Sequence, residues 1–146
     1  MRFAVLVLIC AAACASCGDD TPTSPSSTTA SRATDRFDDI INIGESKFKV
    51  FSVGSNGTTS INLASLSPLN RPGVINATME IGWGKTIKAE DGTVVGCDLA
   101  RVMQTTPALA AQINDTLSPS ADYCANIKDV GGLRESANFS IRITHP

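Results

Sequence analysis

The sequence is poor in the side chains that enzymes use most often for catalysis. Among 146 residues it has one histidine, His145, which lies one residue from the C-terminus. A Ser-His-Asp site needs a histidine that a third group holds in a rigid cleft, so a residue at the chain end is a poor candidate. Zinc needs three or four ligands, and one histidine with two cysteines that we expect to be disulfide-bonded does not supply them. We therefore expect a protein that is not an enzyme and has no cofactor.

The sequence also lacks the charge and the glycine motifs of nucleic-acid and nucleotide binding. Twelve Lys and Arg against 14 Asp and Glu give a net charge of -2, which provides no basic field to attract nucleic acid. The patterns G-x-x-x-x-G-K-[ST] and G-x-G-x-x-G are both absent. We therefore expect no nucleic-acid partner.

Several aspartates are candidate calcium ligands, but none has the spacing of an EF-hand loop. We interpret them as solvated turn residues, and we expect Asp129 in Asp-Val-Gly-Gly to bond to the backbone of its own turn. The candidates are Asp38, Asp39, Asp91, Asp98, Asp122 and Asp129.

What the sequence does contain begins with an apolar leader. Residues 3–13 (FAVLVLICAAA) follow Met1-Arg2 as an unbroken run of 11 apolar or small residues. That run is too short to span roughly 30 Å of hydrocarbon, and its length is typical of the apolar region of a signal peptide. We expect residues 1–16 to be a signal peptide and the protein to be exported to the bacterial cell envelope.

Two kinds of cleavage site compete after the leader. Residues 14–17 (CASC) resemble the lipobox of bacterial lipoproteins, in which the last cysteine is acylated and becomes the N-terminus. Here Cys14 stands where that pattern usually has leucine. Residues 11–14 form a second possible lipobox, and residues 13–15 form an A-x-A site for the ordinary signal peptidase. We favour lipidation of Cys17, which would anchor the protein to a membrane on its periplasmic or cell-surface face.

Cysteine parity favours Cys17 over its rivals. The five cysteines are Cys10, Cys14, Cys17, Cys97 and Cys124. Cleavage before Cys17 removes two of them and acylates the third, which leaves Cys97 and Cys124 as a pair in an oxidising compartment. Either other cleavage leaves an unpaired thiol. A disulfide across these 27 positions should add about 3–4 kcal/mol by the chain-entropy model. The alternative is two buried free thiols.

Residues 17–36 separate the leader from the folded part. From Gly18 to Asp35 there is no aromatic residue and no aliphatic residue beyond alanine. Such a segment cannot offset its ordering entropy by burial, so we expect a disordered tether. About 18 residues would hold the domain some 20–25 Å from the bilayer.

Residues 37–146 change to short alternating runs that are bounded by Gly, Pro, Asn and Asp. Alternation of this kind predicts half-buried strands, and Asp91-Gly92 predicts a tight turn. Residues 109–117 are ambiguous, because Thr106-Pro107 could open a short helix, but we favour a strand for their second half. The predicted strands cover residues 47–53, 61–63, 74–83, 86–89, 93–97, 123–127 and 139–143. These features predict an all-β domain, an antiparallel β-sandwich of the jelly-roll or Ig-like kind with about seven to eight strands.

Trp83 and Tyr123 are the candidate binding residues of this domain. Either ring could stack on a sugar, but both fall on the apolar side of their strands. We therefore favour core packing for both, and sugar binding stays as the alternative.

Five segments of the domain resemble the pre-peptidase C-terminal-like β-sandwich domains of bacterial secreted proteins and lipoproteins. The segments are residues 47–53 (KFKVFSV), 59–66 (TSINLASL), 80–84 (EIGWG), 123–131 (YCANIKDVG) and 139–146 (FSIRITHP). The resemblance covers nearly the whole folded part and implies a disulfide between the Tyr-Cys strand and a cysteine just after the Trp-Gly region, consistent with Cys97. Such domains are usually non-catalytic accessories of secreted hydrolases, and the resemblance implies no catalytic residue.

The sequence thus predicts a non-enzymatic, membrane-anchored envelope lipoprotein whose sandwich is an interaction or structural module. The partner, protein or glycan, is not identified by any motif. The alternative function is a carbohydrate-binding or hydrolase-accessory module. A small hydrolase is disfavoured by the residue inventory.

Overall fold

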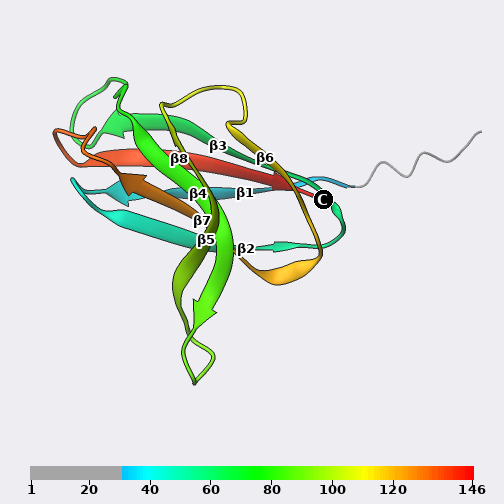
Figure 1. Ribbon diagram of the computed structural model, residues 1–146. Coiled ribbons are helices and arrows are strands. Elements are labelled where there is room, and N and C mark those ends of the chain that lie inside the picture. Colours follow the sequence, from blue (N-terminus) through cyan, green and yellow to red (C-terminus); the bar gives the residue numbers. More distant parts are fainter. Residues whose placement is uncertain (1–30) are drawn as a thin grey trace, which may run out of the picture.

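The computed structural model describes residues 31–146, which form two four-stranded antiparallel sheets (Figure 1). The first sheet has the strand order β1-β8-β3-β6 and the second has the order β2-β7-β4-β5. The strands are β1 (Ala33–Ile41), β2 (Ser46–Val53), β3 (Gly57–Pro68), β4 (Met79–Lys88), β5 (Val94–Thr105), β6 (Ile113–Leu117), β7 (Ser120–Asp129) and β8 (Ala137–His145). This confirms the predicted all-β sandwich. Within residues 31–146, no helix is long and apolar enough to cross a membrane.

The alternating runs build the core because they place every second side chain between the sheets. In β8, Phe139, Ile141 and Ile143 are buried while Arg142 between them is exposed. The ring of Phe139 meets Phe37 of β1 edge to face, with centroids 4.8 Å apart. Buried residues from all the strands except β5 join the same apolar cluster.

The strand predicted over residues 74–83 is displaced along the chain. β4 begins at Met79, and the residues before it form a connection in which the Ile75 N–H donates to the Leu66 carbonyl at 2.9 Å. The inward face is nevertheless the predicted one, since Ala77, Met79 and Ile81 are all buried. Alternation therefore identified the buried face, although hydrogen bonding to β5 and β7 sets the ends of the strand.

The folded part begins before the expected boundary at residue 37. β1 starts at Ala33 and pairs with β8 along its whole length, from Ala33 opposite His145 to Ile41 opposite Ala137. The first residues of β1 belong to the expected tether of residues 17–36, and that expectation is wrong for them. They join the sheet through backbone hydrogen bonds to β8. Their side chains are mostly polar, so the sequence shows no alternating pattern that would predict a strand there.

The predicted turn at Asp91-Gly92 connects β4 and β5. Gly92 has a positive φ of 83°, a conformation that glycine adopts without strain. The Asp91 carboxylate accepts a hydrogen bond from the Thr93 N–H at 2.9 Å. The predicted strand in the second half of 109–117 is β6.

Candidate functional site

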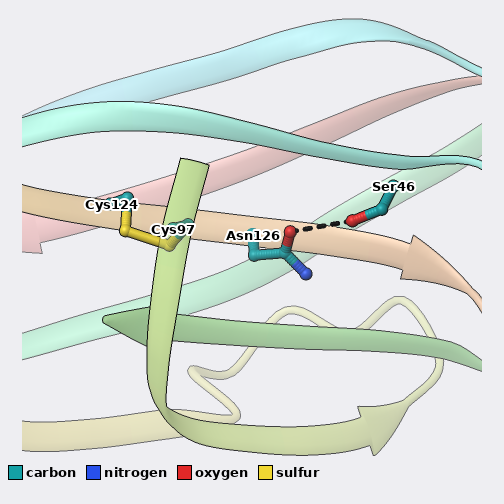
Figure 2. Close-up of a disulfide and its surroundings, with 4 residues drawn as sticks. All are labelled: Ser46, Cys97, Cys124 and Asn126. Atoms are coloured by element: carbon teal, nitrogen blue, oxygen red, sulfur yellow. Dashed lines mark hydrogen bonds between the residues drawn. A yellow bond between two sulfur atoms is a disulfide. The ribbon is translucent and has the colours of Figure 1, made fainter. Parts of the chain in front are cut away.

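The disulfide between Cys97 and Cys124 joins two strands that are not neighbours in their sheet. Cys97 belongs to β5 and Cys124 to β7, and β4 lies between these strands. Their Cα atoms are nevertheless only 5.9 Å apart. Figure 2 shows β5 running across β7 at the disulfide. The end of the second sheet is therefore folded over, so that β5 approaches β7 from outside.

Two glycines of β4 make this approach possible. A Cβ on Gly84 would lie 1.8 Å from the Asp98 carbonyl oxygen, and a Cβ on Gly82 would lie 2.5 Å from the Arg101 carbonyl oxygen. Both contacts are with the backbone of β5, which cannot move away as a side chain can. The Gly-Trp-Gly sequence of β4 is thus the place where β5 lies against the strand. Glycine inside a strand is a known signal of such close approach. The two glycines could therefore have been used to predict, from the sequence, that another backbone lies against this strand.

A polar pair lies beside the disulfide on the same outer face. Asn126 follows Cys124 by two positions in β7 and is only 5% exposed. Its side chain hydrogen-bonds the Ser46 hydroxyl of β2 at 3.0 Å (Figure 2). Asn126 pairs with Gly82, over which β5 passes. β5 therefore passes beside the buried Asn126 on the outer face of the second sheet.

Trp83 and Tyr123, the two candidate binding residues, lie together at the side of the sandwich. Their rings meet edge to face with centroids 5.9 Å apart. Tyr123 is 4% exposed, and its hydroxyl donates to the Ser118 carbonyl at 3.1 Å. Trp83 is half-buried and packs against the core. Tyr123 therefore has no free face on which a sugar could stack.

Around Trp83 the structure assembles charged residues that the sequence did not single out. The indole Nε1–H donates to Oδ2 of Asp115 in β6 at 2.7 Å, and Arg101 of β5 donates to Oδ1 of the same carboxylate at 2.6 Å. The Lys85 ammonium lies 4.3 Å from the centre of the Tyr123 ring. Asp115 thus links both sheets, because it bonds residues of β4 and β5 from its place in β6.

His145 is buried, although it lies one residue from the C-terminus. It is 7% exposed and lies 5.9 Å from the Phe51 ring, centre to centre. Its Nε2 is 3.3 Å from Oδ2 of Asp35, and its Nδ1 is 3.3 Å from the Pro146 carbonyl oxygen. The pairing of β1 with β8 holds the imidazole in place. Each ring nitrogen therefore has an oxygen of the chain beside it.

Asp129 organises the loop that follows β7, as its Asp-Val-Gly-Gly sequence predicted. Its Oδ1 accepts hydrogen bonds from the N–H groups of Gly131, Gly132 and Leu133 at 2.9–3.1 Å, and its Oδ2 accepts one from Gly44 at 2.8 Å. The side chain is almost fully buried. Burial raises the pKa of this carboxyl, but the four N–H donors outweigh burial, and the pKa is lowered from its ordinary value of 3.8.

The other candidate calcium ligands are dispersed over the molecule. Asp39 pairs with Lys47 at 2.8 Å, and Asp122 forms an ion pair with Lys88. Each cation holds the pKa of its carboxylate below the ordinary value. Asp91 is held by the Thr93 N–H of its own turn, which lowers its pKa too. Within residues 31–146, no three His, Cys, Asp or Glu side chains lie close enough to hold a metal ion.

The two ends of the sandwich are formed by different loops (Figure 1). The entry pole, formed by residues 31–33, 54–57 and 145–146, is where the chain enters β1. There Arg32 donates to the Thr58 carbonyl at 3.1 Å, and the Gly54 N–H donates to the Pro146 carbonyl at 3.3 Å.

The far pole, formed by the loops 42–45, 69–78 and 130–136, lies at the other end of β1. Four of its aliphatic side chains are exposed, up to 82% for Val74. A hollow of about 290 Å³ opens beside the ion pair of Arg71 with Glu135. The exposed aliphatic residues are Ile43, Leu69, Val74 and Val130.

Cys17, the expected lipidation site, lies outside the described residues, as do Cys10 and Cys14 and the whole expected signal peptide. The nearest described feature is the entry pole, 14 positions further along the chain at Ser31. Comparisons of the chain with models of known protein families and with curated proteins gave no match.

Proposed function

We propose that this protein is a non-enzymatic lipoprotein of the bacterial cell envelope, held by a lipid on Cys17, whose sandwich is an interaction module. The observation that carries the proposal is the disulfide between Cys97 and Cys124. Disulfides of this kind belong to exported proteins. Once these two cysteines are paired, cleavage before Cys17 leaves no unpaired thiol in the mature chain.

The arrangement of the two poles supports a display role. A lipid on Cys17 would lie upstream of the entry pole, so the far pole would be free to face other molecules. Asp129 ties two of the far-pole loops together, because it binds Gly44 of one loop and Gly131 to Leu133 of the other. Recognition residues are often placed on loops that a rigid scaffold positions. Exposed aliphatic side chains suit a protein partner better than a charged polymer.

The chemistry of the single histidine supports binding over catalysis. A general base must be within hydrogen-bond reach of the proton that it abstracts. The ring nitrogens of His145 face Asp35 and the Pro146 carbonyl, and both contacts tie the C-terminal strand to β1 and the chain end. We therefore assign His145 a structural role at the entry pole.

A carbohydrate-binding module has less support. Sugar platforms need an exposed aromatic face with free polar groups beside it. Tyr123 is buried, and the indole N–H of Trp83 and one oxygen of Asp115 already satisfy each other. Arg101 occupies the second oxygen of the same carboxylate.

Mass spectrometry of the chain extracted from membranes of a bacterial host tests the anchor. We expect an N-terminal peptide that begins at an acylated Cys17, together with a peptide in which Cys97 is linked to Cys124. Cys17→Ser should release the protein into the soluble fraction, whereas the matched control Cys14→Ser should leave it in the membrane. A soluble wild-type chain that begins at Ser16 would overturn the proposal, and so would acylation at Cys14.

A further inference from the structure

The disulfide lies on the outer face of the second sheet and not in the apolar cluster between the sheets, although Cys124 is fully buried. Tyr123 and Ala125, the neighbours of Cys124 in β7, belong to the core cluster, but neither cysteine does. Successive side chains of a strand point to opposite faces, so Cys124 points outward. The packing of one sheet on the other thus does not depend on contacts of the disulfide.

The disulfide instead closes a loop that contains an edge strand of each sheet, β5 and β6. Between Cys97 and Cys124 the chain completes β5, crosses to the first sheet as β6, and returns to the second sheet as β7. β6 has only five residues and pairs with β3 alone, from Ile113 opposite Ile61 to Leu117 opposite Gly57. β5 pairs with β4 alone and is mostly exposed.

Beyond its ladder with β4, few groups restrain β5. Arg101 donates to Asp115 of β6, and Met103 is the one β5 side chain that packs partly against the core. β6 is held more firmly, because Ile113 and Leu117 are core residues. The segments that open most readily in proteins are those with few buried apolar contacts and many exposed backbone hydrogen bonds. The disulfide is the one covalent cross-link that restrains β5 within the described residues.

We propose that the Cys97–Cys124 disulfide is a reducible latch on β5. When it is reduced, β5 lifts from the glycines of β4 and becomes mobile, while the other seven strands stay packed. Lifting β5 exposes the outer face of β4 and β7, including Gly82, Gly84 and Asn126. This inference is independent of the lipid anchor.

A protein or small-molecule dithiol is the reductant that this step requires. Its thiolate attacks the sulfur of Cys97, which is the more exposed cysteine, and the sulfur of Cys124 leaves as a thiolate and takes a proton. The second thiol of the reagent then displaces Cys97 from the mixed disulfide. The products are two cysteine thiols and the oxidised, disulfide form of the reagent, so that two electrons and two protons pass to the protein.

Hydrogen exchange of the full chain in detergent, followed by mass spectrometry, tests the latch with dithiothreitol as the probe. Reduction should speed exchange in peptides from β5 by about tenfold or more. Peptides from β3, β6 and β8 should change by less than about twofold. Peptide mapping with a thiol alkylating reagent confirms that Cys97 and Cys124 have been reduced.

The double variant Cys97→Ala, Cys124→Ala is the matched control. It should show the fast exchange of the reduced protein in β5 without dithiothreitol, and the reagent should change nothing further. Unchanged exchange in β5 after complete reduction would overturn the proposal. Loss of protection in β3, β6 and β8 together with β5 would overturn it too, since the disulfide would then be a determinant of the whole fold.

Discussion

Asp129 shows how one side chain can set the geometry of a whole pole. Its carboxylate accepts four backbone hydrogen bonds from two loops, and it is almost completely buried. The glycines at positions 44 and 131 have positive φ angles of 73° and 91°, which lets their N–H groups turn toward it. A buried carboxylate with this many donors is worth more than a surface ion pair, because removing it leaves all the donors unsatisfied.

Replacement of Asp129 should therefore be costly. Asp129→Ala should lower the free energy of unfolding by about 3–4 kcal/mol, and Asp129→Asn by about 2 kcal/mol, because an amide can satisfy one set of donors only. Urea denaturation followed by circular dichroism measures both values. The control is Asp91→Ala, whose exposed carboxylate caps a single turn and should cost about 1 kcal/mol or less. Equal effects at the two positions would contradict this account of the far pole.

Trp83 offers a spectroscopic test, because it is the only tryptophan of the chain. Its indole N–H depends on Asp115 for an acceptor. Asp115→Ala should shift the fluorescence emission to longer wavelength, increase quenching by acrylamide, and lower the free energy of unfolding by about 1–2 kcal/mol. The matched control Asn114→Ala, at the exposed neighbouring position, should leave the emission unchanged. A wild-type emission shift on addition of oligosaccharides would instead favour the carbohydrate-binding alternative.

At the scale of the element, the fold-over of β5 depends on the absence of a side chain at Gly84. Gly84→Ala should displace the Asp98 carbonyl and should lower the free energy of unfolding by about 3 kcal/mol. It should also reduce the fraction of chains with the Cys97–Cys124 disulfide, which a shift on non-reducing electrophoresis measures.

Gly96→Ala is the matched control for this prediction. A Cβ there would meet the terminal methyl of Ile87 at 3.2 Å, which is the flexible end of a side chain. This variant should cost less than about 1 kcal/mol and keep the disulfide. If both variants form the disulfide equally well, the close approach at Gly84 is not what places β5 over β7.

The elements also show what the sequence could and could not predict. Alternation identified the inward residues of β4 and β8, because burial of one face imposes a period of two. It predicted no strand where β1 lies, because β1 is paired through its backbone with β8, a strand about a hundred positions away in the chain. It also missed the fold-over of β5. Two backbones in close contact produce no alternating pattern, and the only sign of the contact in the sequence is the pair of glycines in β4. Cysteine parity anticipated the disulfide but not the crossing that it requires.

At the scale of the whole molecule, less of the candidate site could be predicted than of the fold. The core roles of Tyr123 and Trp83 follow from their strand faces, which the sequence shows. The partners of Trp83 do not, because Asp115 reaches it from the other sheet through tertiary packing alone. The far pole is likewise a product of topology, since its three loops are separated by whole strands in the chain. The loops that carry Ile43 and Val74 come to the same end of the sandwich only when β1, β3 and β8 are aligned.

The stability of the molecule in acid depends on the aspartates whose pKa values are lowered in the folded state. The pKa of Asp129 is lowered in the folded state, so its contribution to stability is fully present above the pKa of the unfolded chain, near pH 4. That contribution is lost as the pH falls further through the folded pKa. Asp39 and Asp122 shift in the same direction, but they are exposed and their ion pairs are screened by salt.

We therefore expect the free energy of unfolding to be nearly constant from pH 7 to pH 5 and to fall below about pH 4. Urea denaturation at a series of pH values measures this curve. In 0.5 M NaCl most of the fall should remain, because Asp129 is shielded from salt by burial. Asp129→Asn should be less stable than the wild type at pH 7 and should lose less stability on acidification, so that the two curves converge at low pH. Parallel curves would mean that Asp129 is not the group whose protonation destabilises the fold.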